Sequence, residues 1–297
     1  MPIFVALLLS QGCAVQATTP LVLQSDFGVK DNAVASMKGV AVSVSRDLDI
    51  YDLTHEVPAF DIWEASLRLS QTAEYWPKGT VFVSVVDPGV GTARKSVVLK
   101  TGTGQYFVSP DNGSLTAVAQ AFGIEAVREI DEAVNRLADS EKSYTFHGRD
   151  VYAYTGARLA AGVITFEQVG RRLPDQVVMI AYQKPVFEDG RIVGNIEILD
   201  PQFGNIWTNI DRDTFEQLGL APGDRVAIAI SRDGEIVYDG TMPYFKSFGL
   251  VETGDPLLYL NSLNDVALAI NQGNFSEAFN VFSGPGWSIE ISKHREK

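Results

Sequence analysis

Two short segments of the sequence concentrate residues that could do chemistry. Segment 87–94 (Asp-Pro-Gly-Val-Gly-Thr-Ala-Arg) places Asp87 and Arg94 at the two ends of a glycine-containing loop, where they could meet as an ion pair. Segment 146–150 (Phe-His-Gly-Arg-Asp) places His147 at the start of a predicted helix. Carboxylate, guanidinium and imidazole groups are each of a type that can take part in acid–base or electrostatic chemistry. Each segment also has a simpler interpretation, as a plain turn for the first and a structural histidine for the second.

Two other clusters contain residues suited to binding a nucleoside. Asp26 follows a predicted strand and precedes a predicted helix, where its carboxylate can accept hydrogen bonds from both hydroxyls of a ribose. Its alternative role is a helix N-cap. Segment 200–209 contains Phe203, Asn205 and Trp207, whose rings can stack on a planar base and whose amide can contact the edge of that base. The alternative for this segment is an aromatic pair in a β core beside an Asn turn.

The composition excludes several classes of function. The chain has 37 Asp and Glu against 24 Lys and Arg, a formal net charge of −13, and an acidic surface repels the phosphates of nucleic acids. The single cysteine excludes an intrachain disulfide and a thiolate-rich metal site, and three histidines argue against a histidine-rich zinc centre. No Gly-x-Gly-x-x-Gly is present, which argues against the usual dinucleotide-binding fold. We therefore expect a small-molecule ligand, no nucleic-acid partner and no metal.

The first half of the chain must place the polar clusters at strand ends. Residues 19–182 alternate short apolar strands with amphipathic helical stretches. The predicted strands are 21–23, 49–53 and 80–86, and the predicted helices are 32–45, 61–75 and 151–161. This alternation predicts an α/β domain with a mostly parallel sheet covered by helices on both faces. Asp26 and Asp87 then lie at the carboxyl ends of strands, where ligand sites of such folds gather.

The character of the sequence changes near residue 185, where short strands punctuated by Gly, Pro and Asp begin. Segment 232–235 (Arg-Asp-Gly-Glu) has the Asp-Gly pair of a tight hairpin turn. Residues 188–292 are therefore predicted to form a small antiparallel β domain, a sandwich or a barrel. A two-domain chain also agrees with the length of 297 residues.

Residues 1–18 are predicted to be an export signal and not part of the fold. An apolar run over 3–9 resembles the core of a secretory signal, and 15–17 (Val-Gln-Ala) is an acceptable cleavage site. Cys13 follows a segment that loosely resembles a lipoprotein attachment box. The apolar run is too short to span a membrane, which takes about 20 residues. If 1–18 is a signal, the protein is periplasmic or secreted; if it is an ordinary extension, the protein is cytoplasmic.

Six motifs, taken in order, resemble one protein family. They are Ser25-Asp26-Phe27-Gly28, Thr54-His55-Glu56-Val57-Pro58, Asp87-Pro88-Gly89-Val90-Gly91, Pro110-Asp111-Asn112-Gly113, Phe146-His147-Gly148-Arg149-Asp150, and Asp200 with Phe203-Gly204-Asn205. The sequence resembles the S-adenosyl-L-methionine hydrolases that form adenosine, which are related to the fluorinase and chlorinase that use the same substrate. The resemblance covers about residues 20–292.

This resemblance implies a fold, a reaction and a set of site residues. The implied architecture is an N-terminal α/β domain and a C-terminal β-barrel domain, in a homotrimer with active sites between neighbouring subunits. The implied reaction is attack of water on ribose C5′ of S-adenosylmethionine, without any cofactor. A catalytic triad falls on Asp87, Arg94 and His147. The implied substrate-binding residues are Asp26 for the ribose diol, Phe60, Asp200, Phe203, Asn205 and Trp207 around the pocket, and Ser262 near the methionine carboxylate.

The reaction chemistry agrees with the composition. A sulfonium leaves as a neutral thioether, so neither a metal nor an acid is needed, and a carboxylate-rich protein attracts a cationic substrate. The resemblance also implies that halogenases have a small hydroxyl residue where this chain has Gly148, and that they lack the Asp-Arg-His triad. A hydrolase is therefore expected. The alternatives are a chlorinase-like halogenase and an exported protein that binds adenosyl compounds without turnover.

Overall fold

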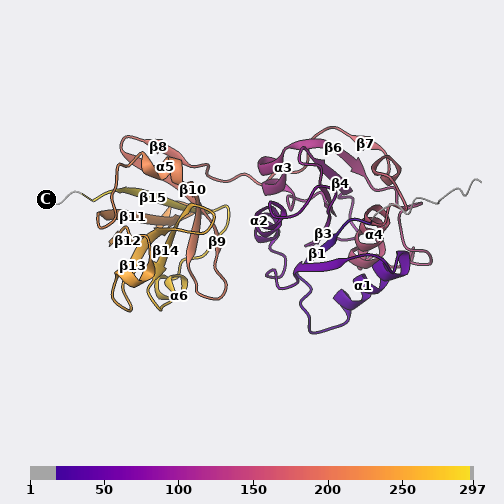
Figure 1. The fold of residues 1–297 in the computed structure, drawn as a ribbon, viewed down its shortest axis with the longest axis horizontal. Coiled ribbons are helices and arrows are strands. Elements are labelled where there is room, and N and C mark those ends of the chain that lie inside the picture. The colour runs from indigo at the N-terminus through magenta and orange to yellow at the C-terminus, as the bar shows by residue number, and fades with distance from the viewer. Residues whose placement is uncertain (1–17, 295–297) are drawn as a thin grey trace, which may run out of the picture. The chain divides into compact units, whose positions relative to one another are not determined.

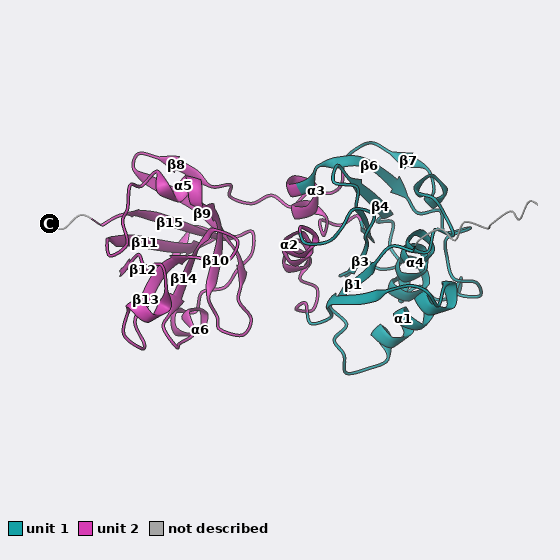
Figure 2. Cartoon of the chain, in the orientation of Figure 1, with its two compact units in different colours: residues 1–56, 75–110, 122–176 teal, residues 57–74, 111–121, 177–297 magenta. Residues whose placement is uncertain are grey.

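The computed structural model describes residues 18–294, so almost all of the predicted export signal, including Cys13, lies outside the described residues. The chain divides into two compact units (Figure 2). Unit 1 comprises residues 1–56, 75–110 and 122–176, and unit 2 comprises 57–74, 111–121 and 177–297. Two segments of the N-terminal half thus belong to the unit that contains the C-terminal sheet. The predicted domain limits, 19–182 and 188–292, stay a prediction.

Unit 1 contains a seven-stranded sheet in the described part of the chain, in the order β2-β1-β3-β5-β4-β6-β7. Its strands are β1 (Leu21–Ser25), β2 (Ile50–Thr54), β3 (Val81–Val85), β4 (Ser96–Thr101), β5 (Tyr106–Pro110), β6 (Ile124–Glu129) and β7 (Arg172–Leu173). Strands β2, β1, β3 and β5 pair in parallel, and β6 runs in the same direction because it is antiparallel to β4, which is antiparallel to β5. The sheet is therefore mostly parallel, and the carboxyl ends of β1 and β3 are neighbours.

Helices of unit 1 cover the sheet with their apolar faces (Figure 1). The helical elements are α1 (Ala33–Val44), the π-helix η1 (Gly148–Ala153), α4 (Tyr154–Ala160) and the 3-10 helix η2 (Phe166–Val169). Met37 of α1 and Tyr152 of η1 are fully buried in the cluster that also contains Leu21 and Val83 of the sheet. Gly156 lets α4 approach the sheet closely, because a Cβ there would lie 2.4 Å from Val83 Cγ2.

Unit 2 contains an eight-stranded antiparallel sheet in its described residues, in the order β12-β11-β15-β9-β10-β14-β13, with β8 paired to β9. Its strands are β8 (Val186–Glu188), β9 (Arg191–Leu199), β10 (Ile206–Asp211), β11 (Arg225–Arg232), β12 (Glu235–Pro243), β13 (Pro256–Leu260), β14 (Asp265–Ile270) and β15 (Trp287–Lys293). The two ends of this order approach each other just after β12, where the Phe245 amide donates to the Leu258 carbonyl at 3.0 Å. The sheet is therefore nearly closed.

Apart from α2, the helices of unit 2 are short. The helical elements of this unit are α2 (Ile62–Ala73), α3 (Thr116–Phe122, to residue 121 in this unit), α5 (Arg212–Glu216), the 3-10 helix η3 (Phe248–Leu250) and α6 (Phe275–Phe279). Helix α2 begins at an Asp61 cap and is tied to the sheet by Trp63, whose Nε1 donates to the Glu197 carbonyl at 2.7 Å. In the described part of the chain, no helix has the length and apolar content to span a membrane. Together the two units confirm the predicted fold class, a mostly parallel α/β sheet followed by a nearly closed antiparallel β sheet.

Candidate active site

A buried ion pair between Asp87 and Arg94 lies beyond the carboxyl end of β3. Arg94 Nε donates to Asp87 Oδ1 at 2.9 Å and to Oδ2 at 3.0 Å, and Nη2 also donates to Oδ2. Only 11% of the Arg94 side chain and 5% of the Asp87 side chain are exposed. Burial is the largest single effect and acts to lower the pKa of Arg94, but the hydrogen bonds to Asp87 together with the nearby charges, including those of Asp87 and Glu132, outweigh it and raise that pKa. The guanidinium is therefore charged at every pH of interest.

The loop between these two residues is built from consecutive tight turns. The Val90 amide donates to the Asp87 carbonyl at 3.1 Å, and the Thr92 amide donates to the Gly89 carbonyl at 3.1 Å. Gly91 has a φ of +76°, and a Cβ there would lie 2.8 Å from a backbone oxygen. A glycine is thus required at this position, and the turns bring the two ends of the loop together.

His147 contacts the other side of the guanidinium. Its Nδ1 lies 3.2 Å from Arg94 Nη2. Because a guanidinium only donates, Nδ1 must accept, and the proton of the neutral ring must sit on Nε2. Burial lowers the pKa of His147, and the charges of Arg94 and Arg136 add to this effect against the opposing charges of Glu132 and Asp87. The imidazole is therefore neutral at pH 7, with its Nε2–H available as a donor.

Tyr152 and Ser96 complete the surroundings of this ion pair. Arg94 Nη1 donates to Ser96 Oγ at 3.0 Å, and Ser96 Oγ lies 3.1 Å from the Tyr152 hydroxyl. The Tyr152 hydroxyl lies 3.4 Å from Asp87 Oδ2, and its ring lies under the guanidinium, 5.6 Å from centroid to Cζ. Burial raises the pKa of Tyr152 well above its ordinary value, so the hydroxyl keeps its proton and can donate. Sequence reasoning missed both residues.

The π-helix η1 explains why His147 and Tyr152 face the same group. In an α-helix, residues five positions apart point in different directions, whereas the wider i→i+5 turn of a π-helix brings them to one side. The π-helix covers Gly148–Ala153 and His147 caps it. The sequence indicates a helix start at this point, but nothing in the apolar pattern distinguishes a π turn from an α turn.

Gly148 closes the site on a further side. A Cβ at this position would lie 3.0 Å from two ring carbons of Phe27 and 3.2 Å from Val85 Cγ1. The Phe27 ring is itself held by an edge-on contact with Phe146, with 5.9 Å between centroids. A side chain larger than hydrogen is thus excluded beside His147 unless Phe27 moves.

Asp26 lies at the same edge of the sheet as the ion pair. It directly follows β1, whose last residue Ser25 pairs with Val85 at the end of β3. Asp87 comes two residues after Val85, and Phe27 packs against Gly148 next to His147. The structure therefore gathers four predicted site residues at the carboxyl ends of two neighbouring strands. They are Asp26, Asp87, Arg94 and His147.

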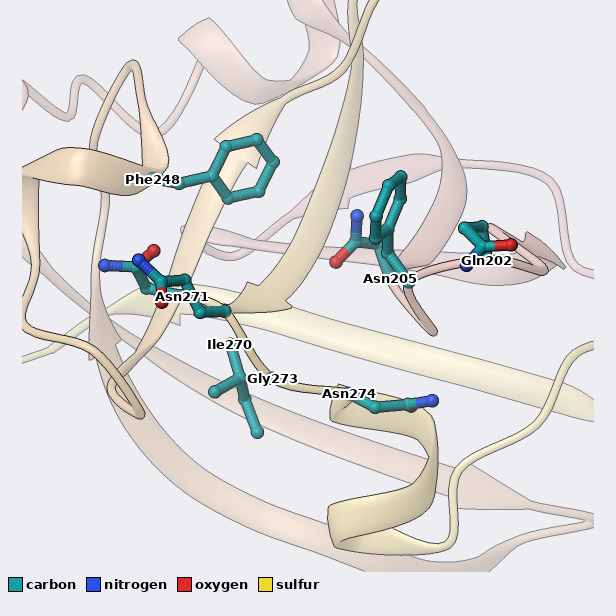
Figure 3. A pocket seen from close by; sticks show the side chains of 9 residues that line it. Gln202, Asn205, Phe248, Ile270, Asn271, Gly273 and Asn274 are labelled. Carbon is teal, nitrogen blue, oxygen red and sulfur yellow. The ribbon is translucent and has the colours of Figure 1, made fainter.

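Unit 2 contains a cavity of about 700 Å³ lined by aromatic and amide side chains, called here the aromatic cavity (Figure 3). Its lining residues are Gln202, Phe203, Asn205, Phe248, Ile270, Asn271, Gln272, Gly273 and Asn274. Figure 3 shows Asn205 and Phe248 on opposite sides of the space. Phe203 and Phe248 are large apolar side chains left 61% and 39% exposed, whereas Asn205 is 6% exposed. Two open rings and a fixed amide are suited to a flat polar heterocycle.

Asp200 shapes the loop that holds this cavity. Its Oδ1 accepts from the amides of Gln202 and Phe203 at 3.1 and 3.3 Å. Its backbone amide donates to the Asn205 carbonyl at 2.9 Å, and its carbonyl accepts from the Gly204 amide at 2.8 Å. Asp200 thus positions Phe203 and Asn205 through the backbone, as an Asx turn does.

Besides Asp200, which acts through the backbone of its loop, three predicted binding residues of unit 2 do not line the aromatic cavity. Trp207 of β10 packs in apolar clusters with residues such as Tyr259 and Trp63. Phe60 is 70% exposed and has a φ of +69°, and Ser262 is exposed in the turn after β13. Their binding roles stay predictions. Phe248, which sequence reasoning missed, lies 43 residues beyond Asn205 in the chain, and no motif connected the two.

Among residues 18–294, no group of three or more His, Cys, Asp or Glu side chains could hold a metal ion. The candidate residues form two separate groups, which are a carboxylate, a guanidinium and a neutral imidazole in unit 1 and an aromatic cavity lined by amides in unit 2. The fold that carries these groups, a mostly parallel α/β sheet followed by a nearly closed antiparallel β sheet, is that of a mixed α/β protein.

The chain belongs to the S-adenosyl-L-methionine hydroxide adenosyltransferase family. The model of the family's N-terminal domain matches residues 21–170, and the model of its C-terminal domain matches residues 194–288. The family is enzymatic and acts on S-adenosyl-L-methionine. Family membership was predicted from six ordered motifs and is confirmed.

Relatives with two different names are similar to this chain. A fluorinase from Actinoplanes sp. (strain N902-109) is 31% identical over 289 residues, which cover 89% of this chain and 95% of the relative. An (R)-S-adenosyl-L-methionine hydrolase from Methanocaldococcus jannaschii is 33% identical over 267 residues, covering 88% of this chain and 92% of the relative. The crystal structure of an uncharacterized conserved protein from Thermotoga maritima matches with a TM-score of 0.83 and 37% identity, over 92% of this chain and 100% of that one.

Proposed function

We propose that this protein hydrolyses S-adenosyl-L-methionine to adenosine and L-methionine. The oxygen of a water molecule attacks ribose C5′, the C5′–sulfur bond breaks with both electrons going to sulfur, and one proton of the water is released. The observation that carries this proposal is the contact of Arg94 with both Asp87 and His147 at the carboxyl edge of β1 and β3. Within the described residues, this arrangement leaves one Nη1–H of Arg94 and the Nε2–H of His147 to donate to an oxygen nucleophile.

Each member of the triad has a distinct role in this reaction. Arg94 and the Nε2–H of His147 stabilise the negative charge that develops on the attacking oxygen. His147 Nδ1 already accepts from Arg94, so the imidazole serves as a donor and not as the base. Asp87 Oδ1 accepts one hydrogen bond within the described residues, from Arg94 Nε, and a carboxylate oxygen has two lone pairs. Asp87 is therefore the group that receives the proton.

Residues from neighbouring subunits are proposed to bind the substrate. Asp26 accepts hydrogen bonds from the ribose diol, and the aromatic cavity holds adenine between Phe203 and Phe248 with Asn205 at the edge of the base. Phe60, Asp200, Trp207 and Ser262 are assigned to the substrate pocket by the family resemblance. We propose further that the protein works without a cofactor, as a homotrimer with active sites between neighbouring subunits.

Halide transfer is the second candidate, because relatives named fluorinase are similar to this chain to about the same degree. The packing around Gly148 favours hydrolysis. A serine at this position would place its Cβ 3.0 Å from the Phe27 ring, so this ring would have to move before a hydroxyl that binds a halide could be admitted. The triad, by contrast, is suited to an oxygen nucleophile.

Turnover in ¹⁸O-labelled water tests the proposal. The purified protein is incubated with S-adenosyl-L-methionine, and the products are separated and weighed by mass spectrometry. Adenosine that carries one ¹⁸O, formed together with methionine, is expected. Parallel reactions with fluoride and with chloride should contain no halogenated adenosine.

Halogenated product would favour the halogenase, and calorimetric binding without any product would favour a binding protein. Light scattering that gives the mass of a monomer would contradict the trimer.

A further inference from the structure

A chain of four polar side chains runs from the surface of unit 1 to the turn that contains Asp26. Lys38 Nζ of α1 donates to Asp52 Oδ2 of β2 at 2.6 Å, and Asp52 Oδ1 lies 3.1 Å from His55 Nε2. His55 Nδ1 lies 2.7 Å from Ser25 Oγ at the end of β1. Lys38 and Asp52 are partly exposed, whereas His55 and Ser25 are 3% and 0% exposed. We call this set the relay.

Two residues of the relay, Ser25 and His55, accept hydrogen bonds from backbone amides of the turn that contains Asp26 and Phe27. The Phe27 amide donates to Ser25 Oγ at 3.3 Å. The Gly28 amide donates to the His55 carbonyl at 2.7 Å. Gly28 has a φ of +68°, which a residue with a side chain adopts only at a cost, so the turn needs these contacts to hold its shape. His55 therefore holds the turn twice, through its ring and through its backbone.

The hydrogen bonds of the relay have one consistent direction. The Asp52 carboxylate only accepts, so the His55 proton sits on Nε2, and Nδ1 accepts from the Ser25 hydroxyl. Ser25 Oγ is then free to accept from the Phe27 amide. Burial lowers the pKa of His55 and outweighs the hydrogen bond and charge of Asp52, which act to raise it. The neutral ring that this direction requires is thus the form present at pH 7.

The Ser25–His55–Asp52 order resembles the triad of a serine hydrolase, but its burial argues for a different role. A nucleophile must be reached by substrate, and Ser25 has no exposed surface in the structure. Its hydroxyl is also engaged between a ring nitrogen and a backbone amide. The role of the relay is therefore to fix the turn that contains Asp26 and Phe27, whose ring lies beside Gly148.

We propose that His55 is a positioning residue for nucleoside binding, one that fixes the Asp26 carboxylate and the Phe27 ring through Ser25. This inference rests on the proposed function only in assigning the ribose diol to Asp26. It gives the relay a specific task, the recognition of a sugar that carries both the 2′ and the 3′ hydroxyl. Loss of His55 should therefore weaken binding of a ribose far more than binding of a sugar without these hydroxyls.

Calorimetric binding of two nucleosides tests the proposal without requiring turnover. Adenosine and 2′,3′-dideoxyadenosine are titrated into the wild-type protein, His55→Ala, His55→Asn and Ser25→Ala. His55→Ala is expected to weaken adenosine binding about tenfold, the loss of about one to two hydrogen bonds, and to leave dideoxyadenosine binding within about twofold. His55→Asn keeps an acceptor near Ser25 and should retain most of the adenosine affinity. His294→Asn, in unit 2, is the matched control and should resemble the wild type for both ligands.

A second readout and a double variant separate positioning from general stability. Hydrogen exchange of the Phe27 and Gly28 amides should become faster in His55→Ala while exchange in β3 stays unchanged. When His55→Ala is added to Asp26→Ala, the affinity for adenosine should not fall further.

An equal loss of affinity for both nucleosides, additive effects with Asp26→Ala, or a wild-type protein that binds the two nucleosides equally would overturn the inference. Discrimination of the diol without any hydrolysis would instead sustain it and remove the proposed reaction. If His55→Ala does not fold, Ser25→Ala carries the same test, with His55→Asn as its conservative control.

Discussion

Arg94 Nη2 donates a hydrogen bond to Nδ1 of His147 at 3.2 Å. This contact determines which ring nitrogen carries the proton and turns the imidazole into a donor toward the nucleophile. It also makes the protonated ring unfavourable, because Nδ1–H would then face a guanidinium N–H. The contact therefore connects the protonation state of His147 to the geometry of the whole triad.

The activity should consequently fall in acid. The pKa of His147 lies below its ordinary value because of burial, with Arg94 and Arg136 adding to the effect. Since the neutral ring is the active form, kcat/KM should rise with pH through a midpoint below 6.5 and then stay level toward pH 8. A pH profile of kcat/KM for adenosine release measures this. Activity that increases in acid would contradict the assigned tautomer.

Removing the charge of the buried carboxylate should abolish turnover and spare binding. Asp87→Asn keeps the shape of the side chain but loses the ion pair and the proton acceptor, so kcat should fall by about 10²–10³ or more. Calorimetry with S-adenosyl-L-methionine should show an affinity close to that of the wild type. Asp175→Asn, which removes an exposed ion pair with Arg172, is the control. Full turnover in Asp87→Asn would remove Asp87 from the triad.

The hydroxyl of Tyr152 should matter for the rate although it lies behind the guanidinium. Tyr152→Phe keeps the ring under Arg94 and removes the contacts to Ser96 and to Asp87. Without these contacts Arg94 is held less firmly and stabilises the transition state less well. We therefore expect kcat to fall about tenfold with little change in KM. Ser96→Ala should resemble it. Steady-state kinetics of both variants checks this, and a change confined to KM would place Tyr152 in substrate binding.

The crowding at Gly148 predicts that a serine there will not create a halogenase. Gly148→Ser should lower hydrolysis at least tenfold, since the Phe27 ring must move to admit the new side chain. The double variant Phe27→Leu/Gly148→Ser should recover part of the lost rate. Product chromatography in chloride measures both quantities. Appearance of 5′-chloro-5′-deoxyadenosine in the single variant would show that the pocket admits a halide.

The sequence predicted the reactive side chains at the strand ends, Asp87 and Arg94. It did not predict Tyr152 and Ser96, the side chains that contact them. Asp87 and Arg94 end one glycine-containing loop, so their ion pair follows from local turn chemistry. Tyr152 joins them only because η1 is a π-helix, and that difference depends on packing between helix and sheet. Ser96 joins them because β4 begins beside the loop.

Long-range pairing explains the other omissions. Ser25 and His55 meet because β1 and β2 pair in parallel, with a shift of register after Leu23 that no local pattern reveals. The fold class was predictable because strands and helices alternate and then give way to short hairpin strands. The assignment of residues 57–74 and 111–121 to unit 2 was not, because it depends on which surface each helix contacts.

Two carboxyl groups in unit 2 have pKa values far above the ordinary range. Glu197 and Asp265 line a second cavity of about 490 Å³. Burial, with a contribution from the charge of Asp265, raises the pKa of Glu197 to about 7. Burial, with a contribution from Asp211, raises the pKa of Asp265 to about 7. Both groups are therefore protonated in the folded protein at a pH where they are ionised in the unfolded chain.

The contribution of Glu197 and Asp265 to the stability of the protein should therefore decrease as the pH rises from about 4 to 7. In this window these two groups bind more protons in the folded state than in the unfolded state, so their contribution to the free energy of unfolding falls with pH and levels off above the folded-state pKa. Glu197→Gln removes the ionisable group and should stabilise the protein at pH 8 by about 1–2 kcal/mol, less than the full shift implies because water reaches this side chain in part. At pH 4 the variant and the wild type should unfold alike. Urea unfolding at both pH values measures the difference, with the exposed Glu188→Gln as control. Equal stability at pH 8 would mean that Glu197 ionises there without penalty.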